Sequence, residues 1–251
     1  MKPATACDRI PAVPDSLPIF PPSLLHGGIA IPLRVRAHPR ARRIALRIDA
    51  SGDAVEMVLP RRSSRVEALR FLEASRGWID RRLAALPPRI SFADGASVPV
   101  MDMPHVIRAM GAATRGQGPA WIAEGELRVA GDPAFLARRA RDFLRGLAKR
   151  ELSARAEKLA AAIDRKIKRV TVRDTVSRWG SCARSGNLSF SWRLIFAPEA
   201  VIDYVVAHEV AHLIEMNHGA RFWRLVEKLP PGAKAQRLWL NRNRTRLMRI
   251  G

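Results

Sequence analysis

Residues 201–223 have the sequence VIDYVVAHEVAHLIEMNHGARFW, and the rest of the chain is best understood outward from this stretch. It contains an HExxH segment, in which His208 and His212 are four residues apart and Glu209 follows the first histidine. Positions i and i+4 lie on one face of a helix, so both imidazoles can bind a single metal ion. The spacing therefore predicts a helix-borne zinc site with Glu209 beside the metal, where its carboxylate can hold a water molecule.

The helix that carries this segment is predicted to be buried. Pro198 and Glu199 are typical of a helix start. Apolar side chains then cover most of the helix surface: Val201, Val205, Val206, Val210, Leu213 and Ile214. Polar groups on a buried helix must pair with one another or bind a ligand. Asp203 and Glu215 are therefore candidate partners for the imidazole N–H groups, and the plainer alternative is a buried helix whose histidines are satisfied without a metal.

A catalytic zinc site needs a third protein ligand and an open position for water. His218 is the leading candidate, although in an unbroken helix its position six residues after His212 would turn it away from the metal. The chain must therefore turn after Met216, and the sequence Asn-His-Gly at residues 217–219 is typical of a helix end. Glu215 and Glu227 remain alternative third ligands.

Several further segments add a resemblance to a known family. They are SRWGSC at residues 177–182, LSFSWRLIFAPEAVIDYVVAHEVAHL at residues 188–213 and NHGARFW at residues 217–223. With these segments the chain resembles the YgjP-like metallopeptidase family, a relative of the SprT-like zincins. The resemblance extends from about residue 34 to about residue 248 and includes VLP at residues 58–60 and FLEASRGWIDRRL at residues 71–83.

The resemblance implies a zincin-type C-terminal domain. It implies that His208 and His212 bind zinc, that His218 is the third ligand and that Glu209 is the catalytic acid/base. Gly219 departs from the family, which more often has serine there, but this difference affects the turn rather than the chemistry. Residues 1 to about 29 form an extra N-terminal segment outside the resemblance.

The expected reaction is hydrolysis by a water molecule that the metal activates, with Glu209 as the proton acceptor and donor. A basic residue should stabilise the developing oxyanion, and Arg178 and Arg193 are candidates for this role or for substrate contacts. Tyr204 lies one turn before His208 and is a further candidate, with packing as its main expected role. Cys182 is expected to be a buried small residue rather than a nucleophile or a metal ligand.

The composition is strongly basic. The chain has 251 residues, a formal net charge of +21 and 47% hydrophobic residues, which is enough apolar material for a folded core. Such a charge favours anionic partners, nucleic acid among them. Most of the 44 basic residues are arginines, however, and this bias can also reflect the nucleotide composition of a genome.

The sequence favours a cytoplasmic protein without a membrane segment. Cys7 and Cys182 are the only cysteines, which is unlike a disulfide framework. Residues 1–25 are proline-rich and lack the basic and apolar regions of a secretory signal. The chain has no uncharged apolar run long enough to span a bilayer.

The pattern of elements predicts an α+β protein in three parts. Residues 1–28 contain many prolines and end in Gly-Gly, which predicts a tail. Residues 29–131 are expected to form an N-terminal, mostly antiparallel β domain with helices. Residues 132–251 are expected to form a zincin-like helical domain with a small sheet, so that the domain boundary lies just before Asp132.

Periodicity predicts the elements of both domains. Apolar and basic residues alternate in three segments of the N-terminal domain, which predicts a three-stranded antiparallel meander over residues 31–36, 43–48 and 55–59. Ser63 or Ser64 is expected to cap the first helix. Further helices are predicted at residues 78–86, 132–163, 220–229 and 233–248, and further strands at residues 105–110, 121–129, 168–172 and 187–195.

Three functions follow from these features. The favoured one is a zinc metallopeptidase that cleaves a peptide or protein substrate, including proteins bound to nucleic acid. In the second, the same metal site hydrolyses nucleotides or other phosphate compounds, which suits the arginine content. The third is a basic nucleic-acid-binding protein with a structural zinc, but the open coordination and the intact Glu209 argue against it.

Overall fold

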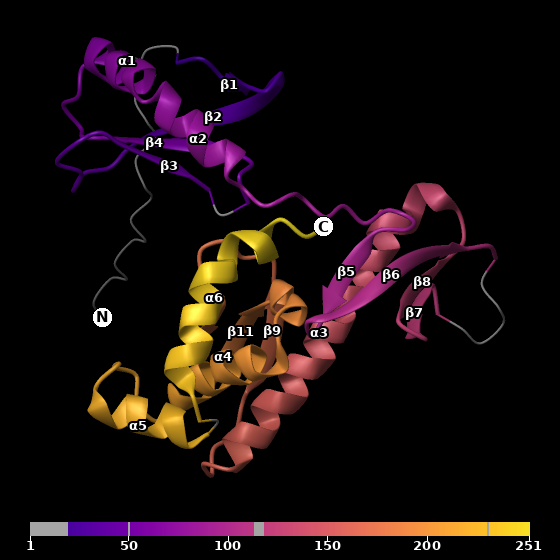
Figure 1. The fold of residues 1–251 in the computed structure, drawn as a ribbon. Helices are drawn as coiled ribbons and strands as arrows, with labels where there is room; N and C mark the ends of the chain where they lie inside the picture. Colours follow the sequence, from indigo (N-terminus) through magenta and orange to yellow (C-terminus); the bar gives the residue numbers. More distant parts are fainter. Residues whose placement is uncertain (1–19, 50, 113–117, 230) are drawn as a thin grey trace, which may run out of the picture. The chain divides into compact units, whose positions relative to one another are not determined.

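The structure is a computed structural model, and it describes residues 20–49, 51–112, 118–229 and 231–251. The chain forms two compact units, Met1–Leu86 and Pro87–Gly251, each with a hydrophobic core of its own. The regular elements among the described residues are helices and the strands of three small sheets (Figure 1). The α+β class predicted from the sequence is confirmed.

The first unit contains a four-stranded sheet in the order β1-β2-β4-β3. Its strands are β1 (Ser23–His26), β2 (Ile29–Ala37), β3 (Ala45–Ile48) and β4 (Val55–Leu59). The predicted three-stranded meander is wrong in its strand order, because β4 lies between β2 and β3 and runs parallel to β2. Val55, Met57, Val58 and Leu59 of β4 are all buried, as expected for a central strand that is paired along both edges.

Part of the predicted N-terminal tail belongs to this sheet. Residues 23–26 form β1, which pairs antiparallel with β2, and Leu24 is buried in the core of the unit. Residues 1–19 lie outside the described part of the chain. The segment predicted as a tail therefore includes residues that complete the edge of a sheet.

Two short helices cover the core of the first unit. They are α1 (Arg65–Ala74) and α2 (Arg76–Ala84). The Ser64 hydroxyl accepts a hydrogen bond from the Glu67 backbone N–H at 3.1 Å, so Ser64 is the cap that satisfies one of the free N–H groups of the first turn. Leu72 and Ile79 pack from these helices into the same cluster as Met57.

The second unit begins with another four-stranded sheet, in the order β5-β6-β8-β7. Its strands are β5 (Ser97–Val100), β6 (Met103–Met110), β7 (Ala120–Ala123) and β8 (Glu126–Ala130). The segment expected as one strand at residues 121–129 is a hairpin, because Glu124 and Gly125 both adopt positive φ angles and reverse the chain.

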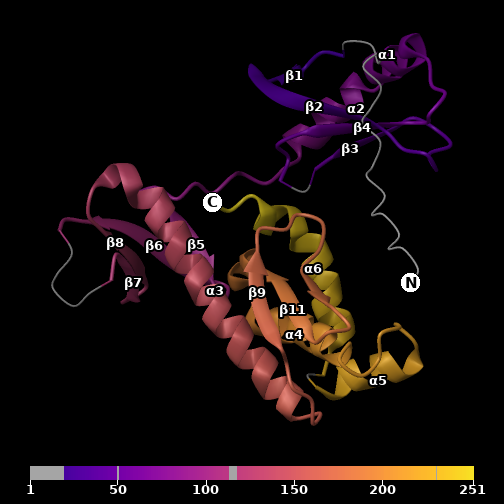
Figure 2. The same ribbon diagram turned by 180° about the vertical axis from the view of Figure 1, so that it is seen from behind.

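The longest helix joins this sheet to the rest of the unit. It is α3 (Leu136–Ala161), preceded by the short 3-10 helix η1 (Pro133–Phe135). Buried residues recur along α3 every fourth position: Leu136, Ala140, Leu144, Ala148, Leu152, Ala156 and Ala160. The alanines let neighbouring elements approach α3 closely. The helix contacts β7 and β8 near its start, and it contacts β9 and α4 further along (Figures 1 and 2).

The boundary between the two units differs from the one predicted just before Asp132. Apolar residues of the β5–β8 sheet, such as Ile107 and Leu127, lie in one core cluster with Leu136 and Leu144 of α3. This shared core makes the sheet part of the second unit, and the structure divides the chain between Leu86 and Pro87.

A three-stranded sheet and three helices complete the second unit. The strands are β9 (Arg169–Arg173), β10 (Gly180–Cys182) and β11 (Asn187–Ser191), in the order β10-β11-β9. β11 runs parallel to β9 and antiparallel to β10. The sequence did not indicate β10, and the strand expected to continue to residue 195 ends at Ser191. Residues 192–196 instead form the 3-10 helix η2 (Trp192–Phe196).

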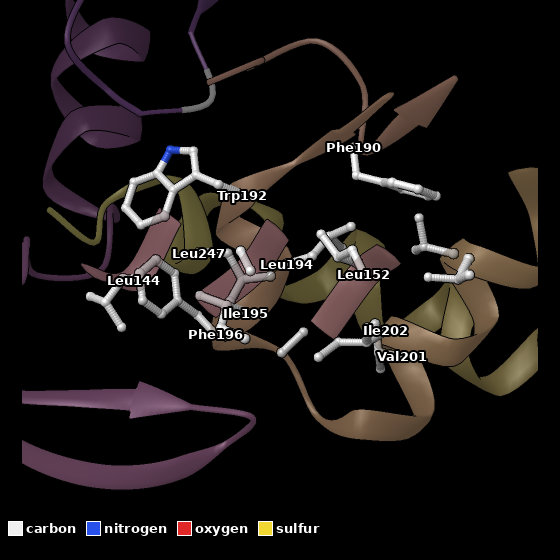
Figure 3. Close-up of a cluster of buried hydrophobic side chains, with 14 of the residues drawn as sticks. Leu144, Leu152, Phe190, Trp192, Leu194, Ile195, Phe196, Val201, Ile202 and Leu247 are labelled. Atoms are coloured by element: carbon white, nitrogen blue, oxygen red, sulfur yellow. The ribbon is translucent and has the colours of Figure 1, made fainter. Parts of the chain in front are cut away.

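The helices of this region are α4 (Glu199–Ala211), α5 (Ala220–Lys228) and α6 (Ala233–Met248). α4 contacts α3, α5, α6 and β10, which explains why apolar residues occur on most of its surface. Figure 3 shows the core around it, where Phe190, Trp192 and Phe196 gather with Leu144 and Val201. In the described part of the chain, no helix combines the length and apolar character needed to cross a membrane.

Candidate metal centre

The end of α4 brings three histidines together. His208 lies in the last turn of the helix, and His212 follows its final residue, Ala211. The chain then turns, earlier than the expected turn after Met216, and α5 begins at Ala220. His218 returns to the end of α4, where its Nε2 atom lies 3.1 Å from Nε2 of His208.

These three side chains can hold one metal ion. One ligand atom from each of His208, His212 and His218 lies within 4.8 Å of the other two. Two nitrogens bound to one tetrahedral zinc ion at about 2.0–2.1 Å are about 3.3 Å apart, close to the separation of the His208 and His218 nitrogens. Three imidazoles are also a donor set of catalytic zinc sites, so the residues present fit this metal.

The environment keeps the imidazoles in the form that binds metals. The pKa of His208 is lowered to about 4, mainly by burial and in addition by the neighbouring His212 and His218. Burial also lowers the pKa of His212. Nδ1 of His212 lies 2.9 Å from the main-chain oxygen of Glu215, so an N–H there can donate to this carbonyl and leave Nε2 free for a metal.

Glu209 lies against strand β10. It is only 6% exposed, and a Cβ atom on Gly180 would be 2.5 Å from its Oε1 atom. Because Gly180 has no side chain, the carboxylate can occupy this space beside the strand. Burial raises the pKa of Glu209 to about 7, and the charge of Arg178 opposes this rise. A carboxyl group with a pKa near neutrality suits a group that both accepts and donates a proton.

Aromatic rings surround the histidines. The ring centroid of Phe222 is 4.9 Å from that of His208 and 4.5 Å from that of His212. Trp223 lies 5.8 Å from His208 and 6.0 Å from His218, measured in the same way. These rings, both on α5, form an apolar wall that excludes water from one side of the cluster and contributes to the burial of His208.

The carboxylates considered as metal ligands or imidazole partners make other contacts in the structure. Asp203 accepts a hydrogen bond from Arg155 at 2.6 Å. Glu215 contacts His212 through its main-chain oxygen and not through its carboxylate. Both carboxylate oxygens of Glu227 accept backbone N–H groups at the start of α6, at 2.8 and 3.2 Å. None of the three belongs to the histidine cluster found among the described residues.

Three further candidates from the sequence, Arg193, Arg178 and Tyr204, differ in their surroundings and in what they contact. Arg193 is 8% exposed and donates hydrogen bonds to Asp174 and to the main-chain oxygen of Ile250, so it anchors the C-terminus of the chain. Arg178 is exposed and its charge acts on Glu209. Tyr204 is buried, with its ring centroid 6.1 Å from that of His208, and burial raises its pKa.

Cys182 has the properties of an inert thiol. It is half-buried and packs against the core, and burial raises its pKa to about 11, with a smaller contribution from the charge of Glu209. A thiol with such a pKa is almost entirely protonated at neutral pH and is a poor nucleophile.

Two residues of this region were not identified from the sequence. Gly180 belongs to the SRWGSC segment, but no local sequence pattern indicates that it lies against Glu209. Arg237 is one of several basic residues on α6, and no pattern distinguishes it from the others. In the structure its guanidinium carbon lies 5.7 Å from the Trp223 ring centroid, and its charge acts on His208 and Tyr204.

A helix with two histidines of a three-imidazole cluster and a buried glutamate between them is the kind of centre found in metallopeptidases. The family model described as YgjP-like, metallopeptidase domain, matches residues 42–243. The chain therefore belongs to the YgjP-like family of metallopeptidases.

The chain was also compared with curated proteins and with solved structures. No curated protein matches the chain. Among solved structures, the metallopeptidase zymogen of Pyrococcus abyssi abylysin is similar, with 22% identity and a TM-score of 0.33. That match covers 36% of this chain and 93% of the abylysin chain.

Proposed function

We propose that this protein is a zinc-dependent metallopeptidase in which His208, His212 and His218 hold the metal and Glu209 transfers the proton. The observation that carries this proposal is the cluster itself, three imidazole ligand atoms within 4.8 Å of one another, with a buried glutamate on the adjacent helix position. Membership of a metallopeptidase family supports the same reaction class.

Each residue has a defined task in this proposal. Zinc, when bound, supplies a Lewis acid and lowers the pKa of a water molecule to about 7. Glu209 accepts a proton from the attacking water and passes it to the leaving amine, a role worth about 10²- to 10⁴-fold in rate. The main-chain oxygen of Glu215 orients His212. Arg178 is the candidate for stabilising negative charge on the substrate, because its own charge reaches Glu209.

Strand β10 supports a peptide as the substrate. It stands at the end of its sheet and pairs with β11 on one side only among the described residues. Gly180 of this strand lies against Glu209, so the strand runs beside the proposed catalytic group. An extended peptide can add to such an edge through main-chain hydrogen bonds, which would bring its peptide bonds close to Glu209.

The test combines metal content with peptide cleavage. We expect about one zinc per wild-type chain, loss of zinc in His218→Ala, and retained zinc without turnover in Glu209→Gln. Glu227→Gln is the matched control for the third ligand, and it should keep its zinc. A wild-type protein that binds no divalent metal, or a Glu209→Gln variant that cleaves peptides at the wild-type rate, would refute the proposal. A nucleoside triphosphate tested in parallel distinguishes peptide from phosphate hydrolysis.

A further inference from the structure

A hollow lies between α5 and α6, next to the histidine cluster. Its volume is about 540 Å³, and its lining includes Trp223 and Arg224 from α5 and Lys234 and Arg237 from α6. A space of this size can hold an amino-acid side chain or the end of a peptide.

Trp223 connects this hollow to the metal centre. Its ring lines the hollow and also lies 5.8 Å from the His208 ring and 6.0 Å from the His218 ring, centroid to centroid. Arg237 also lies over the Trp223 ring, with its guanidinium carbon 5.7 Å from the ring centroid. The Trp223 ring is therefore shared by the histidine cluster and the hollow, so a peptide bound at the metal can extend past this ring into the hollow.

The charges in the hollow are unbalanced. Arg224, Lys234 and Arg237 are exposed cations, and Glu227 is the one carboxylate in the lining. Both oxygens of Glu227 already accept backbone N–H groups, from Gly232 and Ala233. Within the described residues, none of the three cations takes part in an ion pair. The hollow therefore presents positive charge without a partner of its own.

We propose that this hollow is a subsite for a carboxylate of the peptide substrate and that Arg237 determines this specificity. The inference rests on the proposed peptidase function and names the class of peptide that the site prefers. A guanidinium group can donate two parallel hydrogen bonds to a carboxylate, and the contact with Trp223 holds it in place. The carboxylate comes from an Asp or Glu side chain or from the C-terminus of the peptide, since both present the same group.

The test measures binding separately from cleavage. Zinc-loaded Glu209→Gln protein is titrated with peptides that carry a single Glu or the matching Gln, each with a free or an amidated C-terminus. Three backgrounds are compared: Glu209→Gln alone, and Glu209→Gln with Arg237→Gln or with Arg242→Gln. Arg242 is the matched control, because it is an exposed arginine on the same helix that does not line the hollow. Removal of either arginine lowers the net charge equally.

We expect the carboxylate peptide to bind about tenfold more tightly than its neutral counterpart, or about 1.4 kcal/mol. This preference should disappear with Arg237→Gln and persist with Arg242→Gln. Arg237→Lys should retain part of it, because a lysine keeps the charge but lacks the paired donors. The peptide pair that shows the preference tells whether a side chain or the chain end supplies the carboxylate.

Several outcomes would overturn the proposal. One is a preference that survives Arg237→Gln, and another is equal binding of acidic and neutral peptides in every background. Arg237-dependent binding of a nucleoside triphosphate without any preference for acidic peptides would assign the hollow to phosphate instead. Failure of the peptidase function would be visible separately. If the wild type cleaves no peptide but binding still shows the Arg237-dependent preference, the peptidase proposal is refuted and the subsite proposal stands.

Discussion

The two units of this chain differ in what they bury. In the first unit, the described core consists of apolar residues around Met57 and Ile79, and Ser51 is the only polar residue classed as buried there. The second unit buries Glu209, Arg193 and Ser191 together with its apolar core. Burying a charged or polar group costs free energy unless it is paired. Polar groups inside a core are therefore more informative about function than the basic surface that both units share.

The largest loss of stability is expected when a buried side chain is shortened, and it should stay within the unit that contains the residue. Leu144 and Ile79 are both fully buried, one in each unit, and replacement of either by alanine should lower the stability of its own unit by about 2–5 kcal/mol. Leu144→Ala should also weaken zinc binding, because Leu144 packs in the same cluster as residues of α4. Thermal unfolding and metal content measured on both variants check this. Loss of zinc in Ile79→Ala would mean that the units are energetically coupled.

Removal of the metal should affect one unit only. A ligand present at about 1,000 times its dissociation constant stabilises the folded state by about 4 kcal/mol. A chelator should therefore lower the unfolding temperature of the second unit and leave that of the first unchanged, as followed by calorimetry. The His218→Ala variant is the control, since a chelator should not change its unfolding. A chelator effect on both transitions would contradict the assignment of the metal to the second unit.

A methyl group placed between β10 and α4 should impair catalysis without removing the metal. In Gly180→Ala the added Cβ would lie 2.5 Å from Oε1 of Glu209, so the carboxylate must move, and we expect kcat to fall about 100-fold with unchanged zinc content. Gly77→Ala is the control in the first unit, because its Cβ would meet only the end of the Arg81 side chain at 3.5 Å. An alanine in this helix should stabilise it by up to about 1 kcal/mol. Full activity in Gly180→Ala would show that the position of Glu209 is not critical.

The smallest effect concerns ion pairs. Arg155 of α3 is 17% exposed and binds Asp203, which is 38% exposed, and Glu199 of α4. In the first unit, His26 is 27% exposed and its partner Asp80 is 47% exposed. Arg155→Gln should destabilise the second unit by about 1–2 kcal/mol, because it removes a mostly buried cation that pairs with three carboxylates, those of Glu151, Glu199 and Asp203. His26→Gln should change stability by less than about 1 kcal/mol. Denaturant unfolding of both variants measures the difference, and equal values would show that burial does not strengthen the Arg155 network.

Local patterns predicted the elements that local interactions stabilise. The sequence located the start of α4 near Pro198, the extent of α6 and the serine cap of α1, because capping groups and helical periodicity act over a few residues. The strand order of the first unit was predicted incorrectly, since strand pairing joins segments that are apart in the sequence and no local pattern specifies it. The partners of Arg193 could not be predicted for a similar reason: Asp174 and Ile250 are distant from it in the sequence.

The HExxH spacing alone predicts that His208, Glu209 and His212 lie together, because one turn at the end of α4 brings them to the same side whatever surrounds it. Which other residues meet this turn depends on the tertiary structure. It brings His218 back to His208, places Gly180 against Glu209 and sets Arg237 beside Trp223. These contacts join separate elements, and their positions follow from the packing of α4 against its neighbours rather than from any local spacing.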